Sequence, residues 1–169
     1  MTAPLLPTIA GPTDLRRLSP EQLPGLAQEI REAIIDQVMT TGGHLAPNLG
    51  VVELTMALHR VFNFEHDRLL FDVGHQCYPH KLLTGRADQL STLRQTGGMA
   101  GFPEPSESPF DLFSVGHAGT GISTAVGMAR GDTLKGEGYH SETNPEGRRT
   151  VALVGDASIV NGLAMEGLN

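Results

Sequence analysis

The chain of 169 residues lacks several features that particular classes of protein require. It has a single cysteine, Cys77, which excludes an internal disulfide and a zinc cluster and makes a reducing cytoplasm the natural setting. No stretch approaches about 18 consecutive apolar residues, so no membrane-spanning helix is expected. Residues 1–9 have neither a cationic segment nor a long apolar core, so we expect no secretory signal.

Positive charge is also scarce. The 12 Lys and Arg residues are outnumbered by 19 Asp and Glu residues, which gives a formal net charge of −7. Because a nucleic-acid-binding module needs a basic face for the phosphates, this acidic balance excludes that class. Glycine, in contrast, is abundant at 21 residues and shows no collagen-like period, which indicates many tight turns and close backbone approaches.

The pattern of apolar residues predicts alternating helices and strands. Residues 1–18 are rich in proline and lack periodicity, so we expect an extended N-terminal arm there. Expected helices cover 20–41, 49–62 (capped by Asn48), 79–84, 88–95, 121–130 and 159–168; expected strands cover 69–74, 110–115 and 150–154; and 135–149 is expected to be a polar surface insertion. This alternation predicts an α/β fold, a parallel sheet with helices on both faces.

Each expected strand ends at, or is followed by, a glycine and then a polar side chain: Gly74-His75, Gly116-His117 and Gly155-Asp156. In open α/β sheets, ligands bind beyond the carboxyl ends of the strands. Glycine lets the backbone approach a bulky anion, and the next helix N-terminus offers free N–H groups. Asp156 adds a hard oxygen ligand for Mg²⁺. The three ends together predict a diphosphate held by backbone donors and a divalent ion.

Each of these features alone also fits a structural role. A glycine-rich turn is common after a strand, an aspartate there is often a helix cap, and a loop histidine is often only hydrogen-bonded. Their repetition at three strand ends favours a binding site. His59, His66 and His140 have no such context and are expected to be surface or packing residues, and Cys77 is expected to be a buried or idle thiol.

Four segments, 43–55, 71–86, 97–117 and 154–169, resemble the N-terminal part of the 1-deoxy-D-xylulose-5-phosphate synthases. These are thiamine-diphosphate-dependent enzymes of the transketolase superfamily, and the resemblance covers roughly residues 12–169. Segment 71–86 is the most specific, because transketolases proper differ after their own Gly-His pair. The resemblance implies that 19–169 is a partial diphosphate-binding domain, incomplete at its C-terminus.

The resemblance also implies a reaction and a site. The family condenses pyruvate, with loss of CO₂, and D-glyceraldehyde 3-phosphate to 1-deoxy-D-xylulose 5-phosphate, which feeds isoprenoid, thiamine and pyridoxal synthesis; the full-length enzyme would be a homodimer. The cofactors would be thiamine diphosphate and Mg²⁺. The implied site residues are His44 as the catalytic residue, His75, Gly116, His117, Ala118, Ala157 and Ser158 as cofactor-binding residues, Asp156 as the metal ligand, and His80 and Lys81 as further candidates.

The sequence departs from the family pattern near this site. Ala157 replaces a glycine, Pro47 replaces a serine, Asn48 stands where a small residue is usual, and Gly119 and Gly121 lie in a turn that is usually rich in serine. A second Mg²⁺ ligand and the glutamate that activates the cofactor would come from later sequence. We therefore expect the chain alone to be inactive and to act as part of a longer synthase.

Two alternatives stay open. One is a truncated, inactive paralogue or a binding module that pairs with an intact synthase; the other is a split transketolase-type enzyme with different substrates. The sheet would also have an uncovered edge in this chain, which predicts poor solubility or dimerisation.

Overall fold

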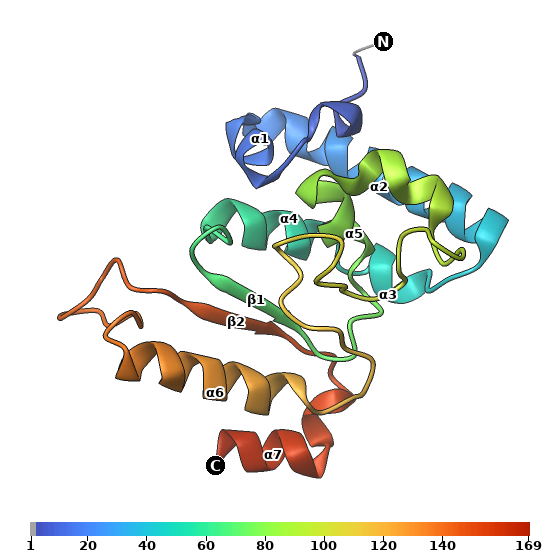
Figure 1. Cartoon of the computed structure of the whole chain (residues 1–169). Helices are drawn as coiled ribbons and strands as arrows, with labels where there is room; N and C mark the ends of the chain where they lie inside the picture. Colours follow the sequence, from blue (N-terminus) through green and yellow to red (C-terminus); the bar gives the residue numbers. More distant parts are fainter. Residues whose placement is uncertain (1–2) are drawn as a thin grey trace. The chain divides into compact units, whose positions relative to one another are not determined.

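The computed structural model describes residues 3–169, which fold into two compact units (Figure 1). Unit 1 combines the described residues up to Asn63 with His75–Pro103, and unit 2 combines Phe64–Gly74 with Glu104–Asn169. None of the helices in the described part is long and apolar enough to cross a membrane.

The N-terminal segment of unit 1 is helical, so the prediction of an extended arm over 1–18 is wrong for its described part. It forms a 3-10 turn, η1 (Leu6–Thr8), and a helix, α1 (Pro12–Arg17). Pro12 begins α1, and a proline is tolerated at the first helical position because its missing N–H would have had no intrahelical partner there.

Long-range contacts hold this segment in place. The Glu29 carboxylate accepts hydrogen bonds from the N–H groups of Leu5 (2.8 Å) and Leu6 (2.7 Å). The Arg60 guanidinium donates to the carbonyls of Leu15 (3.1 Å) and Leu18 (2.9 Å). The side chains of Leu6 and Leu15 are buried, so the segment is part of the core of unit 1.

The long helix of unit 1 begins and ends as predicted. A 3-10 turn, η2 (Pro20–Gln22), carries a capping box in which Ser19 and Gln22 bond reciprocally, and α2 (Leu23–Thr41) follows directly. Gly42 ends the helix with φ of 77°, a left-handed value that glycine adopts without strain. The buried face of α2 is formed by Leu26, Ala27, Ile30 and Ile34.

The rest of unit 1 consists of short helices. Their bounds are α3 (Ala46–Leu49), α4 (Val52–Val61), α5 (Tyr78–Lys81), a π-turn η3 (Leu82–Arg86) and a 3-10 turn η4 (Ala87–Thr92). The helix predicted at 79–84 is thus present as α5 followed by the π-turn, and the helix predicted at 88–95 is present as a shorter 3-10 turn. Gly85 interrupts η3 with φ of 86°, and a Cβ there would lie 2.4 Å from the carbonyl oxygen of Ala10.

Unit 2 is built on two parallel strands, β1 (Arg68–Phe71) and β2 (Thr150–Leu153). They pair in register from Arg68 with Thr150 to Phe71 with Leu153 (Figure 1). Helix α6 (Gly121–Leu134) packs along β2. The parallel α/β architecture predicted from the sequence is confirmed.

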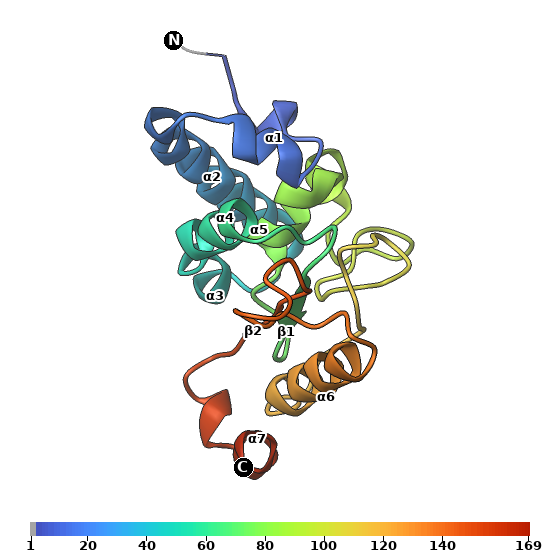
Figure 2. The ribbon, with the colours of Figure 1, turned by 90° about the vertical axis from the view of Figure 1, so that its left-hand side faces the viewer.

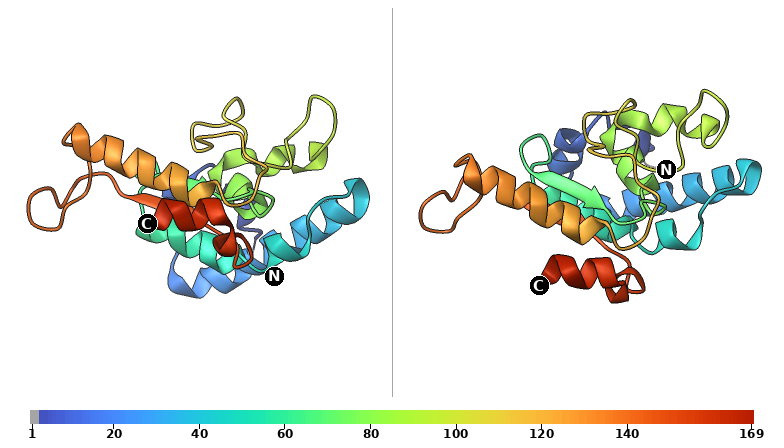
Figure 3. Two further views of the ribbon diagram at one scale, coloured as in Figure 1. Left: turned by 90° about the horizontal axis from the view of Figure 1, so that it is seen from below. Right: turned by 60° about the horizontal axis from the view of Figure 1, so that its bottom comes forward.

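The last predicted helix is broken in two. A 3-10 turn, η5 (Ser158–Val160), precedes α7 (Gly162–Leu168), which packs beside α6 (Figures 2 and 3). The side chain of Asn161 caps α7 by accepting a hydrogen bond from the N–H of Leu163 at 2.9 Å.

The strand predicted at 110–115 does not form, so the described residues hold two strands where the sequence predicts three. Local hydrogen bonds of Asp111 shape the start of this segment. The Asp111 carboxylate accepts the N–H of Glu104 at 2.8 Å, and the Asp111 N–H donates to the carbonyl of Ser108 at 3.1 Å. An apolar run bounded by turn residues therefore forms a folded loop here.

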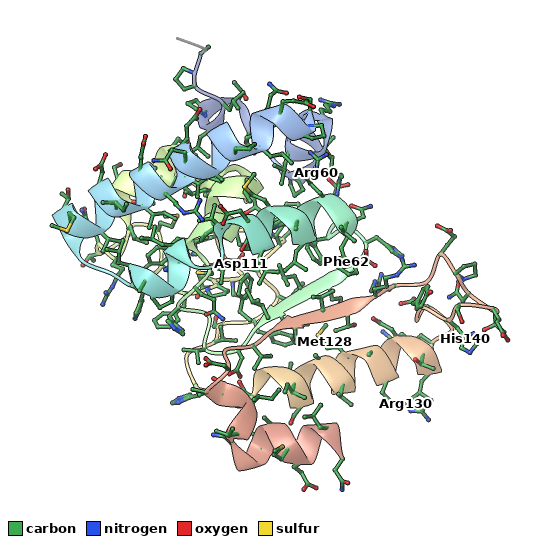
Figure 4. All side chains as sticks on the ribbon, turned by 180° about the vertical axis from the view of Figure 1, so that it is seen from behind. Arg60, Phe62, Asp111, Met128, Arg130 and His140 are labelled. Atoms are coloured by element: carbon green, nitrogen blue, oxygen red, sulfur yellow. The ribbon has the colours of Figure 1, made fainter. Side chains whose placement is uncertain are left out.

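The predicted insertion at 135–149 is a loop between α6 and β2, and His140 lies on it (Figure 4). Arg148 anchors this loop through bonds to Asp132 (3.3 Å), Glu137 (3.1 Å) and the carbonyl of His66 (2.8 Å). Arg68, at the start of β1, forms a bidentate ion pair with the same Asp132. Its Nε donates to Oδ2 at 2.8 Å and its Nη2 donates to Oδ1 at 2.9 Å.

Candidate functional site

The structure brings together two of the predicted site residues, His44 and His75, in unit 1. Their rings meet edge to face with centroids 5.3 Å apart, and the ring of Phe102 lies 5.7 Å from that of His44. Burial, together with the nearby His75 and Arg94, lowers the pKa of His44 below its usual 6.5. The His44 imidazole is therefore neutral near pH 7 and can accept or donate a proton there.

The side chain of Asn48 forms hydrogen bonds with the backbone of both histidines. Its amide nitrogen donates to the carbonyls of His44 (2.6 Å) and His75 (2.9 Å), and its amide oxygen accepts the N–H of Tyr78 (2.8 Å). The prediction that Asn48 caps the next helix is wrong, because α4 begins after Val51 with no side-chain cap. A helix cap and a buried bridge are both typical roles of asparagine, and only the fold distinguishes them.

The other departure in this segment, Pro47, is tolerated. It lies in the first turn of α3, where a proline costs the helix no hydrogen bond.

The Nδ1 atom of His75 is a candidate contact for a ligand. It is buried and has no hydrogen-bond partner among the described residues. A buried polar atom in a native fold normally has a partner, so this nitrogen fits a site that contacts a bound ligand.

In unit 2, the carboxylate of Asp72 organises the glycine-rich turn before α6. One oxygen accepts the N–H of Gly119 at 3.0 Å, and the other accepts the N–H of Gly121 at 2.8 Å. Burial raises the pKa of Asp72, but these bonds, with others from the Ser158 hydroxyl and the Thr120 N–H, outweigh it and hold the pKa below 3.8. Sequence reasoning missed this role, although Asp72 directly follows a strand.

The prediction of free N–H groups at the N-terminus of α6 is wrong for Gly119 and Gly121. The N–H groups of Gly119 and Gly121 are occupied by the carboxylate of Asp72, whereas Gly116, His117 and Ala118 are exposed. A Cβ added at Gly116 would meet no atom within 4 Å, so the backbone there is open to a ligand. The predicted binding segment is thus confined to 116–118.

The two glycines that depart from a serine-rich turn are needed for this geometry. Gly119 has φ of 89°, and a Cβ there would lie 2.5 Å from Cγ of Asn161. A Cβ at Gly121 would lie 2.9 Å from Cβ of Asp72. Both positions therefore require the absence of a side chain.

The predicted metal ligand and its neighbours follow β2 in unit 2. Asp156 and Ala157 are exposed, and the N–H of Ser158 closes the turn onto the carbonyl of Gly155 at 3.0 Å. Ala157 has φ of −68° and ψ of −27°, values that any L-residue adopts, so its methyl group causes no backbone strain. No group of three His, Cys, Asp or Glu residues in the range 3–169 could hold a metal ion together.

The further candidates His80 and Lys81 are fully buried in unit 1. The Nε2 atom of His59 lies 3.0 Å from Nδ1 of His80, and the two rings stack. Burial, the charge of His80 and that of Arg16 lower the pKa of His59 to about 2, so it remains neutral. The prediction of a packing role for His59 and of a buried Cys77 is confirmed.

Comparison with known proteins reveals extensive similarity. The model of a family described as 1-deoxy-D-xylulose-5-phosphate synthase matches residues 6–169. Curated proteins of that name from Dechloromonas aromatica and Thiobacillus denitrificans are 54% and 53% identical to this chain over 165 and 169 residues. These matches cover 98% and 100% of this chain but only 25% and 26% of the relatives, so the chain spans about a quarter of their length.

A solved structure is also similar. Transketolase from Leishmania mexicana superposes with a TM-score of 0.71 at 26% identity, over 89% of this chain and 25% of that one.

Proposed function

The chain belongs to the 1-deoxy-D-xylulose-5-phosphate synthase family, and on that premise we propose that it is the N-terminal part of such a synthase. The reaction would condense pyruvate, with loss of CO₂, and D-glyceraldehyde 3-phosphate to 1-deoxy-D-xylulose 5-phosphate. The observation that carries the proposal is the His44–His75 pair, with one neutral imidazole and one buried ring nitrogen that has no partner among the described residues.

The residues present fit thiamine diphosphate and Mg²⁺ in part. The exposed backbone of Gly116, His117 and Ala118 would take the diphosphate, with Ala157 and Ser158 beside it and Asp156 on Mg²⁺. Bound thiamine diphosphate supplies the electron sink for decarboxylation. The unpartnered Nδ1 of His75 would bond a polar atom of the cofactor.

His44 would handle protons of the substrates. Its lowered pKa keeps a neutral imidazole in place near pH 7, and the protonated ring nitrogen can give a hydrogen bond to an oxygen of a substrate. Phe102 beside its ring would reduce contact with water and so would strengthen such hydrogen bonds.

We further propose that this chain acts only together with the rest of a synthase. The relatives are about four times as long, and within the described residues Asp156 has no second and third ligand grouped with it. In such an assembly the protein would be a cytoplasmic homodimer. These points extend the family assignment and depend on the same experiment.

The test is a chimera in which this chain replaces the matching quarter of the Dechloromonas aromatica synthase. We expect the chimera to form 1-deoxy-D-xylulose 5-phosphate, and His44→Ala to abolish product formation without changing thiamine diphosphate affinity measured calorimetrically. His75→Ala and Asp156→Ala should weaken that affinity. A folded chimera that binds the cofactor but makes no product, or that keeps full activity as His44→Ala, would overturn the proposal.

A further inference from the structure

We propose that Tyr78 is a positioning residue for His44, and that its buried hydroxyl holds the imidazole in the tautomer with a bare Nδ1 and a protonated Nε2. This inference rests on the proposed function, in which His44 handles protons. Tyr78 does not stand out in the sequence. The whole segment 71–86 resembles the family, and nothing in it distinguishes Tyr78 from its neighbours.

The backbone of Tyr78 is held rigidly. Its N–H donates to the amide oxygen of Asn48 at 2.8 Å, and the same side chain bonds the carbonyls of His44 and His75. Asn48 and Tyr78 are both 0% exposed. One buried amide therefore sets the distance between the tyrosine and the two histidines, independently of any ligand.

The backbone before His44 is shaped to admit the tyrosine hydroxyl. Gly43 has φ of 148°, and a Cβ there would lie 2.9 Å from Oη of Tyr78 and 3.3 Å from a methyl group of Val38. Any larger residue would push the hydroxyl away from His44. The close approach therefore depends on glycine at this position.

The hydroxyl has two contacts with His44. The backbone N–H of His44 donates to Oη at 3.3 Å, and the ring Nδ1 lies 3.5 Å from the same oxygen. A tyrosine hydroxyl carries one proton, and a buried donor needs an acceptor. The backbone N–H of His44 is a donor and cannot accept the hydroxyl proton in a hydrogen bond. Nδ1 is therefore the group that accepts the hydrogen bond from the hydroxyl.

This arrangement determines whether His44 presents a hydrogen-bond donor or an acceptor to a substrate. With Nδ1 occupied as an acceptor, the neutral ring carries its proton on Nε2 and presents a donor to its other side. The opposite tautomer would present a lone pair. The contact with Tyr78 thus selects a hydrogen-bond donor for the substrate oxygens, in a ring that His75 and Arg94 help to keep neutral.

The first test is a ¹⁵N NMR measurement on the 169-residue chain, in which ring nitrogen shifts identify the tautomer of His44. We expect a single Nε2–H form in the wild type and a mixture of tautomers in Tyr78→Phe. The matched control is Tyr139→Phe, since Tyr139 is the second of the two tyrosines and lies in unit 2 against Arg149.

A wild-type His44 that carries its proton on Nδ1 would overturn the proposal, even if Tyr78→Phe does not fold. An unchanged tautomer in folded Tyr78→Phe would also overturn it. In the active chimera, Tyr78→Phe should lower kcat about 10-fold to 100-fold with little change in the KM for pyruvate. Because the NMR test needs no turnover, failure of the tautomer assignment is distinguishable from failure of the proposed function.

Discussion

Replacing Asp72 with asparagine should detach the glycine-rich turn before α6 from the end of β1. The carboxylate accepts the N–H groups of Gly119 and Gly121 at 3.0 and 2.8 Å with its two oxygens. Asparagine keeps one oxygen, but its NH₂ group faces the other N–H and leaves it buried without an acceptor. Hydrogen bonds to a charged group contribute about 1.5–3 kcal/mol each, so the free energy of unfolding should fall by about 2–4 kcal/mol.

Thermal unfolding followed by circular dichroism measures this loss. For a chain of this length each kcal/mol corresponds to about 2–4 °C, so Tm should fall by roughly 5–15 °C. The matched control is Asp36→Asn, because Asp36 is exposed on α2 and its replacement should change stability by less than about 0.5 kcal/mol. Hydrogen exchange should also accelerate at the amides of Gly119 and Gly121.

The pH dependence gives a second test of the same carboxylate. Hydrogen bonds hold the pKa of Asp72 in the folded state below 3.8, its value in an unfolded chain. The stabilisation is therefore complete above pH 3.8 and is lost as the pH falls through the folded-state pKa. Asp72→Asn should remove this acid-dependent loss. Unchanged amide exchange at both glycines, with Tm within about 1 °C of wild type, would refute the role assigned to Asp72.

Three further substitutions test other parts of the structure. Gly119→Ala places a methyl group 2.5 Å from Cγ of Asn161 at φ of 89°, so urea titration should give a loss of about 2–3 kcal/mol; a loss below about 0.5 kcal/mol would contradict this packing. His59, with its pKa lowered from 6.5 to about 2, stabilises the fold fully above pH 6.5 and less as the pH falls, by up to about 1.4 kcal/mol per unit; His59→Gln should flatten this slope, and parallel profiles would argue against a neutral His59. Ala157→Gly should change thiamine diphosphate affinity less than about twofold, because the backbone of Ala157 is unstrained, whereas a tenfold gain would indicate that the methyl group obstructs binding.

Local signals in the sequence were sufficient where the determining partners are close in the chain. The capping box of Ser19 and Gln22 and the terminating Gly42 define their helix from both ends, and the structure confirms both. The paired strands β1 and β2 were recognisable from short apolar runs. Such elements depend on residues within a few positions of one another.

The predictions failed where distant partners decide the structure. The N-terminal segment is ordered by Glu29 and Arg60, which no local pattern connects to it. The apolar run at 110–115 has the composition of a strand, but Asp111 closes a turn with Glu104 and no neighbouring strand pairs with it.

In the candidate site, the sequence singles out the histidine-bearing motifs but does not reveal the residues that support them, and the roles of the histidines stay predictions. Its two ring systems follow from glycine-histidine motifs, and the structure brings His44 and His75 together. Asn48 and Tyr78, which contact the two histidines, and Asp72, which holds the glycine-rich turn before α6, each have an ordinary structural explanation in the sequence. Their importance appears only when atoms from distant segments are seen within hydrogen-bond distance.

The two units alternate along the sequence, and this order affects how the chain folds during its synthesis. β1 lies between the two stretches of unit 1, and Arg68 pairs with Thr150, 82 positions later. At about 5–20 residues per second, a ribosome needs roughly 4–16 s to make the partner of β1 after β1 itself. During that interval the strand of a nascent chain has an unpaired apolar edge, which is the kind of segment that a ribosome-associated chaperone would shield.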